Sequence, residues 1–112
     1  MIIILSAQNE TVQSLVDFRF GRSSFLMKVD TETNTFEAFP NPGVGRSGGA
    51  GVAAAQFVID QKVDAVLSGD FGPNAARAFQ LAQIPMYLYS DDIQTVTQAV
   101  EEFRQGKLTQ FE

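Results

Sequence analysis

The chain has 112 residues, of which 45% are hydrophobic and 19% charged, and it contains neither cysteine nor histidine. This length and composition fit one globular domain, residues 1–112, with a single hydrophobic core. The two missing residue types exclude disulfides, zinc sites of the Cys/His type, and catalysis by Cys-His or Ser-His-Asp groups. A net charge of −5 without any basic run argues against nucleic acid or an anionic membrane surface as a partner.

The beginning of the chain gives no targeting signal. The apolar run Met1–Leu5 is too short for the core of a signal peptide and lacks a basic flank. No later run reaches the length of a transmembrane helix. We therefore expect a cytoplasmic protein without a membrane partner.

The first part of the chain predicts strands. Ile2–Leu5 is a continuous apolar run, mostly β-branched, typical of a central strand that is covered on both faces. Residues 11–18 show no clean period, and we expect a loop there with one helical turn. The alternating segments Phe25–Asp30 and Thr35–Phe39 flank a short polar stretch and predict an antiparallel hairpin.

Strands and helices alternate in the second part. The expected elements are a helix over Val52–Ile59, a strand over Val63–Leu67, a helix from Pro73, a strand over Ile84–Tyr89, and a last helix with Ile93, Val96, Val100 and Phe103 on its buried face. Ser90, Asp91 and Asp92 offer oxygens to cap the last helix, Gly106 ends it, and the remaining residues 108–112 are expected to form a tail. The order β-β-β-α-β-α-β-α predicts an α/β fold with a mixed five-stranded sheet.

Polar loops follow three of these strands. In sheets of this kind, ligands bind beyond the carboxyl ends of the parallel strands. The loops after Leu5, Leu67 and Tyr89 emerge there. The glycine stretch precedes a crossover helix and could approach the same place, although sequence alone does not put it there.

The stretch Gly43–Gly51 contains five glycines in nine residues and leads into a predicted helix. Glycine allows backbone amides to approach a ligand closely, and a helix N-terminus favours an anion. Arg46 adds a positive charge inside the stretch. The other interpretation is a flexible connection with a glycine at the helix start, and this stretch alone favours neither.

The arginines are distributed unevenly. Arg19, Arg22, Arg46 and Arg77 fall in or beside glycine-bearing segments, whereas all three lysines lie outside them. A guanidinium group is a rigid fork of donors that suits large anions, so the pattern predicts an anion site. Chance clustering, with solvated arginines in a turn at residues 19–24, is the alternative.

The carboxylates predict no catalytic centre. Asp70 follows a strand end, where a catalytic acid would sit. A magnesium-dependent nuclease would need several converging carboxylates, and the central strand Ile2–Leu5 carries none. We therefore expect neither catalytic residues nor metal-ligating side chains.

Four motifs together carry a resemblance to a known family. They are Arg19-Phe20-Gly21-Arg22 followed by Phe25, then Asn41-Pro42, then Gly48-Gly49-Ala50-Gly51, and finally the stretch from Gly69 to Ala75. In this order and spacing the chain resembles the dinitrogenase iron-molybdenum cofactor biosynthesis family over nearly its whole length. That family includes nitrogenase-cofactor carriers and the orange protein, which holds a molybdenum–copper sulfide cluster. The resemblance implies a ribonuclease H-like three-layer fold without nuclease activity.

The resemblance also implies noncovalent binding of an anionic metal–sulfur cluster or cofactor precursor, of the Mo/Fe or Mo/Cu sulfide type. The expected binding residues are Arg19, Gly21, Arg22, Arg46, Gly48, Gly49, Gly51, Gly72, Pro73 and Asn74. The arginines would pair with charge, the glycines would donate amides, and residues 72–74 would form a facing wall. Proteins that donate or accept the cluster are the expected partners. The alternatives are a site for a phosphorylated small molecule or nucleotide, a divalent-metal hydrolase using Asp70, and a regulatory interaction domain with an empty site.

Overall fold

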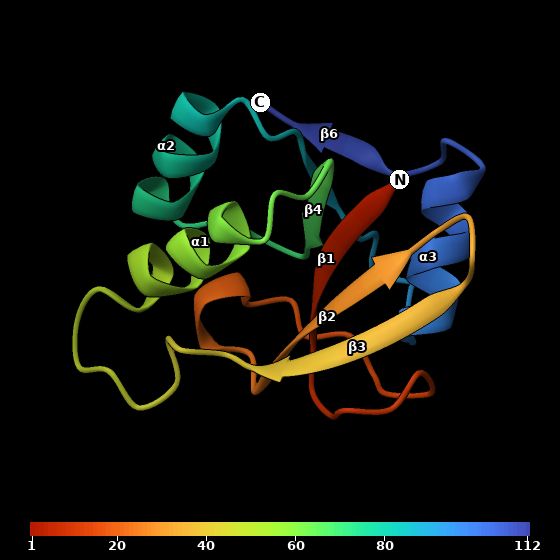
Figure 1. Ribbon diagram of the computed structural model, residues 1–112, viewed down its shortest axis with the longest axis horizontal. Coiled ribbons are helices and arrows are strands. Elements are labelled where there is room, and N and C mark those ends of the chain that lie inside the picture. Colours follow the sequence, from red (N-terminus) through yellow and green to blue (C-terminus); the bar gives the residue numbers. More distant parts are fainter.

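A mixed six-stranded sheet with strand order β3-β2-β1-β4-β5-β6 forms the centre of the computed structural model, which describes residues 1–112 (Figure 1). Its elements are β1 (Ile2–Ala7), the 3₁₀ turn η1 (Phe20–Arg22), β2 (Phe25–Asp30), β3 (Thr35–Pro40), α1 (Ala50–Asp60), β4 (Ala65–Ser68), α2 (Pro73–Ala82), β5 (Met86–Leu88), α3 (Val96–Arg104) and β6 (Thr109–Phe111). β1, β4 and β5 are parallel, and β2 and β3 form the predicted antiparallel hairpin beside β1. The α/β prediction is confirmed.

Helices cover both faces of the sheet, α1 and α2 on one face and α3 on the other (Figure 1). Alternate residues of β1 point to opposite faces, and both faces are apolar, so each helix layer finds a core to pack on. Ile3 and Leu5 join the cluster under α3, whereas Ile4 joins the cluster under α1 and α2. The continuous apolar run at the start of the chain is therefore explained by burial on two sides.

The prediction of five strands is wrong, because the C-terminal residues form a sixth strand. β6 pairs antiparallel with β5, and the ring of Phe111 packs against that of Phe71 at a centroid distance of 5.5 Å. A strand of three residues is too short to show an alternating pattern in the sequence. Residues 108–112 therefore look like a tail, and only their pairing with β5 identifies the strand.

The predicted cap of the last helix is also wrong. α3 begins at Val96, and its N-cap is Thr95, whose side chain accepts a hydrogen bond from the amide of Gln98 at 3.1 Å. The oxygens at Ser90 and Asp92 bond to each other instead. Residues 11–18 form a loop, as predicted, with one hydrogen-bonded turn in which the Ser14 amide donates to the Thr11 carbonyl oxygen at 3.0 Å. After this turn, Leu15 and Val16 form isolated β-bridges with Thr95 and Ala7.

The sheet register brings the glycine stretch to the end where the polar loops emerge. Phe25 of β2 pairs with Ala7 on one side and with Pro40 on the other. The end of β3 therefore lies level with the end of β1, with β2 between them, at what we call the carboxyl end of the sheet. No helix of the structure has the length and apolar character needed to cross a membrane.

Candidate functional site

The chain itself fills the crevice between the ends of β1 and β4. The connections that leave these two neighbouring strands diverge, β1 leading to β2 and β4 to β5, which marks the switch point where α/β sheets usually bind ligands. Here residues 15–20, which we call the crossing segment, pass over this point. Val16 belongs to the core under α3 and Phe20 to the core under α1 and α2. A ligand must therefore bind beside the crossing segment.

Buried hydroxyl groups hold the crossing segment in place. Ser6 Oγ donates to the carbonyl oxygen of Asp17 at 2.5 Å, and the Asp17 amide donates to the Ser6 carbonyl oxygen at 3.1 Å. Ser6 Oγ also lies 2.7 Å from Ser68 Oγ at the end of β4. Phe18 packs directly over Gly69, where a Cβ atom would collide with its ring. The geometry explains why position 69 is a glycine.

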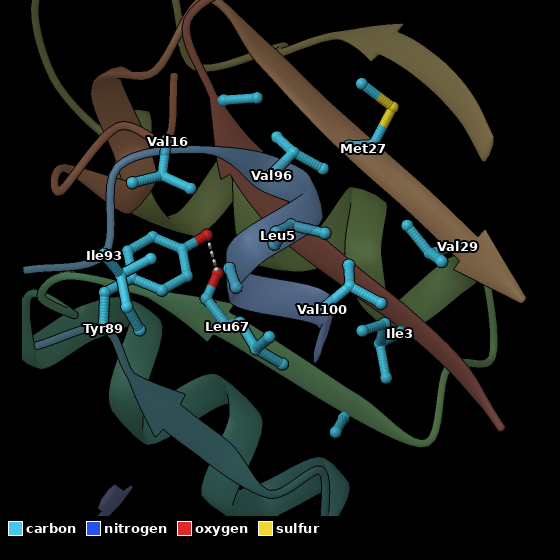
Figure 2. Packing of buried hydrophobic residues seen from close by; sticks show 13 residues of the cluster. Ile3, Leu5, Val16, Met27, Val29, Leu67, Tyr89, Ile93, Val96 and Val100 are labelled. Carbon is cyan, nitrogen blue, oxygen red and sulfur yellow. Dashed lines mark hydrogen bonds between the residues drawn. The ribbon is translucent and has the colours of Figure 1, made fainter. Parts of the chain in front are cut away.

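Tyr89 completes this buried polar network. Its hydroxyl donates to the carbonyl oxygens of Ser6 and Leu67, each at 3.2 Å, and the second bond is drawn in Figure 2. Burial is the main cause that raises the pKa of Tyr89 well above its ordinary value, so the group stays a neutral donor. Phe18 meets the Tyr89 ring edge to face, with centroids 5.9 Å apart. The Tyr89 hydroxyl therefore bridges the backbones of β1 and β4.

A nearly buried carboxylate holds Arg19. The Asp17 side chain is 10% exposed; its Oδ1 accepts from the Arg19 amide at 2.9 Å and from Nε at 3.3 Å. Its Oδ2 accepts from Nη2 at 3.3 Å. The Arg19 side chain is 72% exposed, so its remaining donors face solvent. Arg19 therefore offers directed N–H groups but little net charge.

The η1 turn packs tightly against the glycine stretch and the first turn of α1. A Cβ atom at Gly21 would lie 3.0 Å from the Gly51 Cα atom, and one at Gly43 would overlap the carbonyl oxygens of Gly21 and Ala50. Buried Asn41 clamps the same region. Its Nδ2 donates to the Phe20 carbonyl oxygen at 3.0 Å, and its Oδ1 accepts from the Gly43 amide at 2.9 Å. These glycines allow three backbone segments to touch.

Residues 44–49 of the glycine stretch are exposed, and the stretch is rich in unpaired donors. Arg22 Nη1 donates to the Arg46 carbonyl oxygen at 2.8 Å, and neither arginine has a carboxylate within ion-pair distance. The consecutive amides from Ser47 to Val52 donate to no acceptor within the protein. Gly49 is the N-cap of α1, with a φ of 72° that favours glycine, and no side chain caps this helix.

A second helix begins beside the first. A Cβ atom at Gly51 would lie 3.6 Å from the Cβ of Ala75, so the first turns of α1 and α2 are neighbours. Gly72 is the N-cap of α2 and Pro73 its first residue. Two helix N-termini therefore place their partial positive charge at one spot, next to Arg22 and Arg46.

The structure brings together most of the residues predicted to bind an anion. Gly21, Arg22, Arg46, Gly48, Gly49 and Gly51 share the surface formed by η1, the glycine stretch and α1, with Gly72, Pro73 and Asn74 beside them. We call this surface the amide surface. Arg19 lies apart from it, on the crossing segment, where Asp17 engages it. Arg77 lies one turn into α2.

The amide surface is open, and the larger hollows lie elsewhere. A groove of about 530 Å³ on the α3 side of the crossing segment is lined in part by Leu15, Phe18, Arg19 and Asp91. No three carboxylates are grouped so that they could hold a metal ion. The carboxylate of Asp70 accepts the amide of its neighbour Phe71 at 2.9 Å. The donor set of the carboxyl end therefore fits an anion better than a cation.

Several residues that shape the site escaped the sequence analysis. Asp17 and the hydroxyls of Ser6 and Ser68 carry no local motif. The spacing Asp17-x-Arg19 and serines at the ends of two predicted strands are the signals that could have indicated them. The sequence marks Gly43 only as part of a glycine-rich stretch. Its role is to admit the backbones of Gly21 and Ala50.

Solved structures share this fold over almost the whole chain. The apo form of the orange protein from Desulfovibrio gigas is 34% identical, with a TM-score of 0.89 and coverage of 98% of this chain and 92% of that one. A putative NifB protein from Thermotoga is 22% identical, with a TM-score of 0.82 and coverage of 97% and 91%. A putative dinitrogenase from Methanocaldococcus jannaschii is 12% identical, with a TM-score of 0.70 and coverage of 100% and 95%. No match is found among curated proteins.

A family profile agrees with the first of these similarities. The profile described as dinitrogenase iron-molybdenum cofactor matches residues 1–106, which is nearly the whole chain. The family comprises cofactor-binding or accessory proteins involved in iron-molybdenum cofactor biosynthesis or binding. Both the sequence motifs and the fold lead to the same conclusion: the chain belongs to the dinitrogenase iron-molybdenum cofactor family.

Proposed function

We propose that this protein binds an anionic metal–sulfur cluster or cofactor precursor noncovalently at the amide surface and carries it without catalytic turnover. The observation that carries the proposal is the run of unpaired amides from Ser47 to Val52 beside Arg22 and Arg46, which have no carboxylate partner. Family membership and the similarity to the orange protein support a cargo of the Mo/Fe or Mo/Cu sulfide type.

A sulfide-rich cluster is a large anion that N–H donors can hold at several points. The helix N-termini and glycine amides supply directed donors, and Arg22 and Arg46 supply net positive charge. Arg19 adds donors from the neighbouring crossing segment, and residues 72–74 form the facing wall. Because the chain has no cysteine or histidine, its side chains cannot bind the metals as soft ligands. Noncovalent retention is consistent with that composition.

We also propose a fold relationship, partner proteins and a cellular location for this carrier. The strand order β3-β2-β1-β4-β5, with β2 antiparallel, supports a ribonuclease H-like fold, to which β6 is an addition. The family resemblance implies that this fold acts here without nuclease activity. Donor and acceptor proteins for the cluster would be its partners in the cytoplasm.

A phosphorylated small molecule or nucleotide is the second candidate. Phosphate oxygens would use the same amides and arginines. The groove beside Arg19, which is lined by Leu15 and Phe18, gives room for an apolar moiety next to the anion site.

An anaerobic titration with tetrathiomolybdate, with and without copper or iron, tests the first proposal. We expect a coloured species that co-elutes with the protein in gel filtration. Arg22→Ala combined with Arg46→Ala should lower affinity at least about tenfold, because charge-assisted hydrogen bonds are lost. Lys28→Ala with Lys107→Ala removes the same charge away from the carboxyl end and serves as the control.

Three outcomes separate the candidates. Retention by the control but not by the arginine variant supports the site. Equal retention by both variants would show that the cluster binds elsewhere. Complete separation of colour from the wild-type protein would exclude the tested clusters, and thermal stabilisation by phosphorylated metabolites would then favour the second candidate.

A further inference from the structure

Exposed apolar side chains gather at the carboxyl end of the sheet. Seven large hydrophobic residues of the chain are exposed, and five of them lie on segments at this end, the other two being Met1 and Leu81. The five are Val12, Leu15, Phe18, Val44 and Val52, with exposed fractions of 37% to 54%. Apolar residues concentrated on one face commonly mark an interaction surface.

Charge divides the same end into two halves. The acidic half lies on the α3 side and carries exposed Glu10, Asp91 and Asp92. Asp91 lines the same groove as Leu15 and Phe18. A hydrogen bond from the Ser90 hydroxyl lowers the pKa of Asp92, so this carboxyl group is ionised at neutral pH.

The basic half lies on the α1 and α2 side. It carries exposed Arg22 and Arg46 together with Val44 and Val52. Neither arginine has an ion-pair partner within the chain. Asp17, Arg19 and Asp70 lie between the two halves, where Asp17 balances Arg19.

The division into an acidic and a basic half determines which charge distribution a partner must have. A uniformly anionic partner would be repelled by the acidic half, and a uniformly cationic partner by the basic half. In a second copy related by a two-fold axis along the boundary between the halves, the acidic half of each copy faces the basic half of the other. We propose that the carboxyl end of the sheet is a self-association surface. Two copies pair through it, with Leu15 and Phe18 of each copy facing Val44 and Val52 of the other.

The size and composition of this surface are adequate for a weak dimer. The molecule extends 33 Å along its longest axis and 26 Å along the shortest, and the carboxyl end faces along the remaining axis (Figure 1). A stable interface needs about 800 Å² from each partner, close to what an end of this size offers. Arginine and aromatic residues, which this end exposes, are enriched at interfaces.

Sedimentation velocity of the full chain without any ligand tests the proposal. From about 1 µM to about 1 mM protein, which spans weak affinities, we expect a shift from monomer to dimer that high salt diminishes. Arg22→Glu with Arg46→Glu makes both halves acidic, and Glu10→Lys with Asp91→Lys makes both halves basic. Each variant alone should be monomeric, whereas their equimolar mixture should form a heterodimer.

Control variants separate loss of contact from loss of fold. Leu15→Ser removes exposed apolar surface without changing charge and should weaken the dimer at least about tenfold, with an unchanged circular dichroism spectrum. Lys28→Glu with Lys107→Glu changes charge away from the surface and should leave association intact. A wild-type protein that stays monomeric throughout would overturn the proposal. So would a mixture of the two charge variants that fails to associate. Since no ligand is present, neither result bears on cluster binding.

Discussion

The two sides of the carboxyl end of the sheet differ in whether their polar groups have hydrogen-bond partners inside the protein. Under the crossing segment, Ser6, Ser68 and Tyr89 are buried and bonded to one another or to backbone carbonyl groups. On the amide surface, the amides from Ser47 to Val52 are left without a protein acceptor. No buried side-chain polar atom in the molecule lacks a partner.

The physical reason is access to water. An unpaired polar group that is buried costs free energy, so the hydroxyls beneath Phe18 must find partners inside the protein. Ser47, Gly48 and Gly49 of the glycine stretch are exposed, so water satisfies their amides and a ligand can replace that water at small cost. The polar groups under the crossing segment therefore form a structural network, whereas those of the amide surface are donors available to a ligand.

The largest expected effect is on stability, and it distinguishes glycines in close contact with other backbone atoms from glycines without such neighbours. Gly43→Ala should lower the free energy of unfolding by about 2–3 kcal/mol, because its Cβ atom would meet the backbone oxygens of Gly21 and Ala50. Gly48→Ala is the matched control, since no atom lies within 4 Å of its Cβ position. It should change stability by less than about 1 kcal/mol. Urea denaturation measures both, and equal losses would contradict the division of the glycine stretch.

A smaller effect tests the buried network. Tyr89→Phe removes the donor to Ser6 and Leu67 and should cost about 1–2 kcal/mol near pH 8. Burial raises the pKa of Tyr89, so the folded protein keeps a proton that the unfolded chain loses near pH 10. Wild-type stability should therefore fall as pH rises above about 10, by about 1.4 kcal/mol per unit from this group. The variant lacks this contribution, so the difference in unfolding free energy between wild type and variant should shrink above that pH. Urea denaturation at alkaline pH measures this difference. A difference that stays constant with pH would count against the network.

The smallest effect tests where α3 begins. Thr95→Ala removes the side-chain cap from the Gln98 amide and should cost about 1 kcal/mol. Ser90→Ala, whose hydroxyl contacts only the exposed Asp92, should change stability by less than about 0.5 kcal/mol. Thermal unfolding compares the two. A larger loss at Ser90 would restore the cap that the sequence predicts.

The sequence by itself determined the local features of this protein. The alternating segments around residues 25–39 predict the hairpin, and the apolar, mostly β-branched run Ile2–Leu5 predicts a strand buried on both faces. The four motifs indicate the family, and the glycines and arginines indicate a donor-rich surface. The predictions of the hairpin, the buried strand and the family succeed because period, turn composition and motif spacing depend on residues that are close in the chain.

Tertiary structure decided the rest, because it depends on contacts between residues that are distant in the chain. Ser6 and Ser68 are 62 positions apart, and Tyr89 reaches Ser6 across 83 positions. Such contacts place the crossing segment in the crevice, and the fold likewise adds β6 to the sheet. They also separate Arg19, which Asp17 balances, from Arg22 and Arg46, whose charges are free. No local pattern encodes that distinction, since it arises only when the ends of β1 and β4 meet.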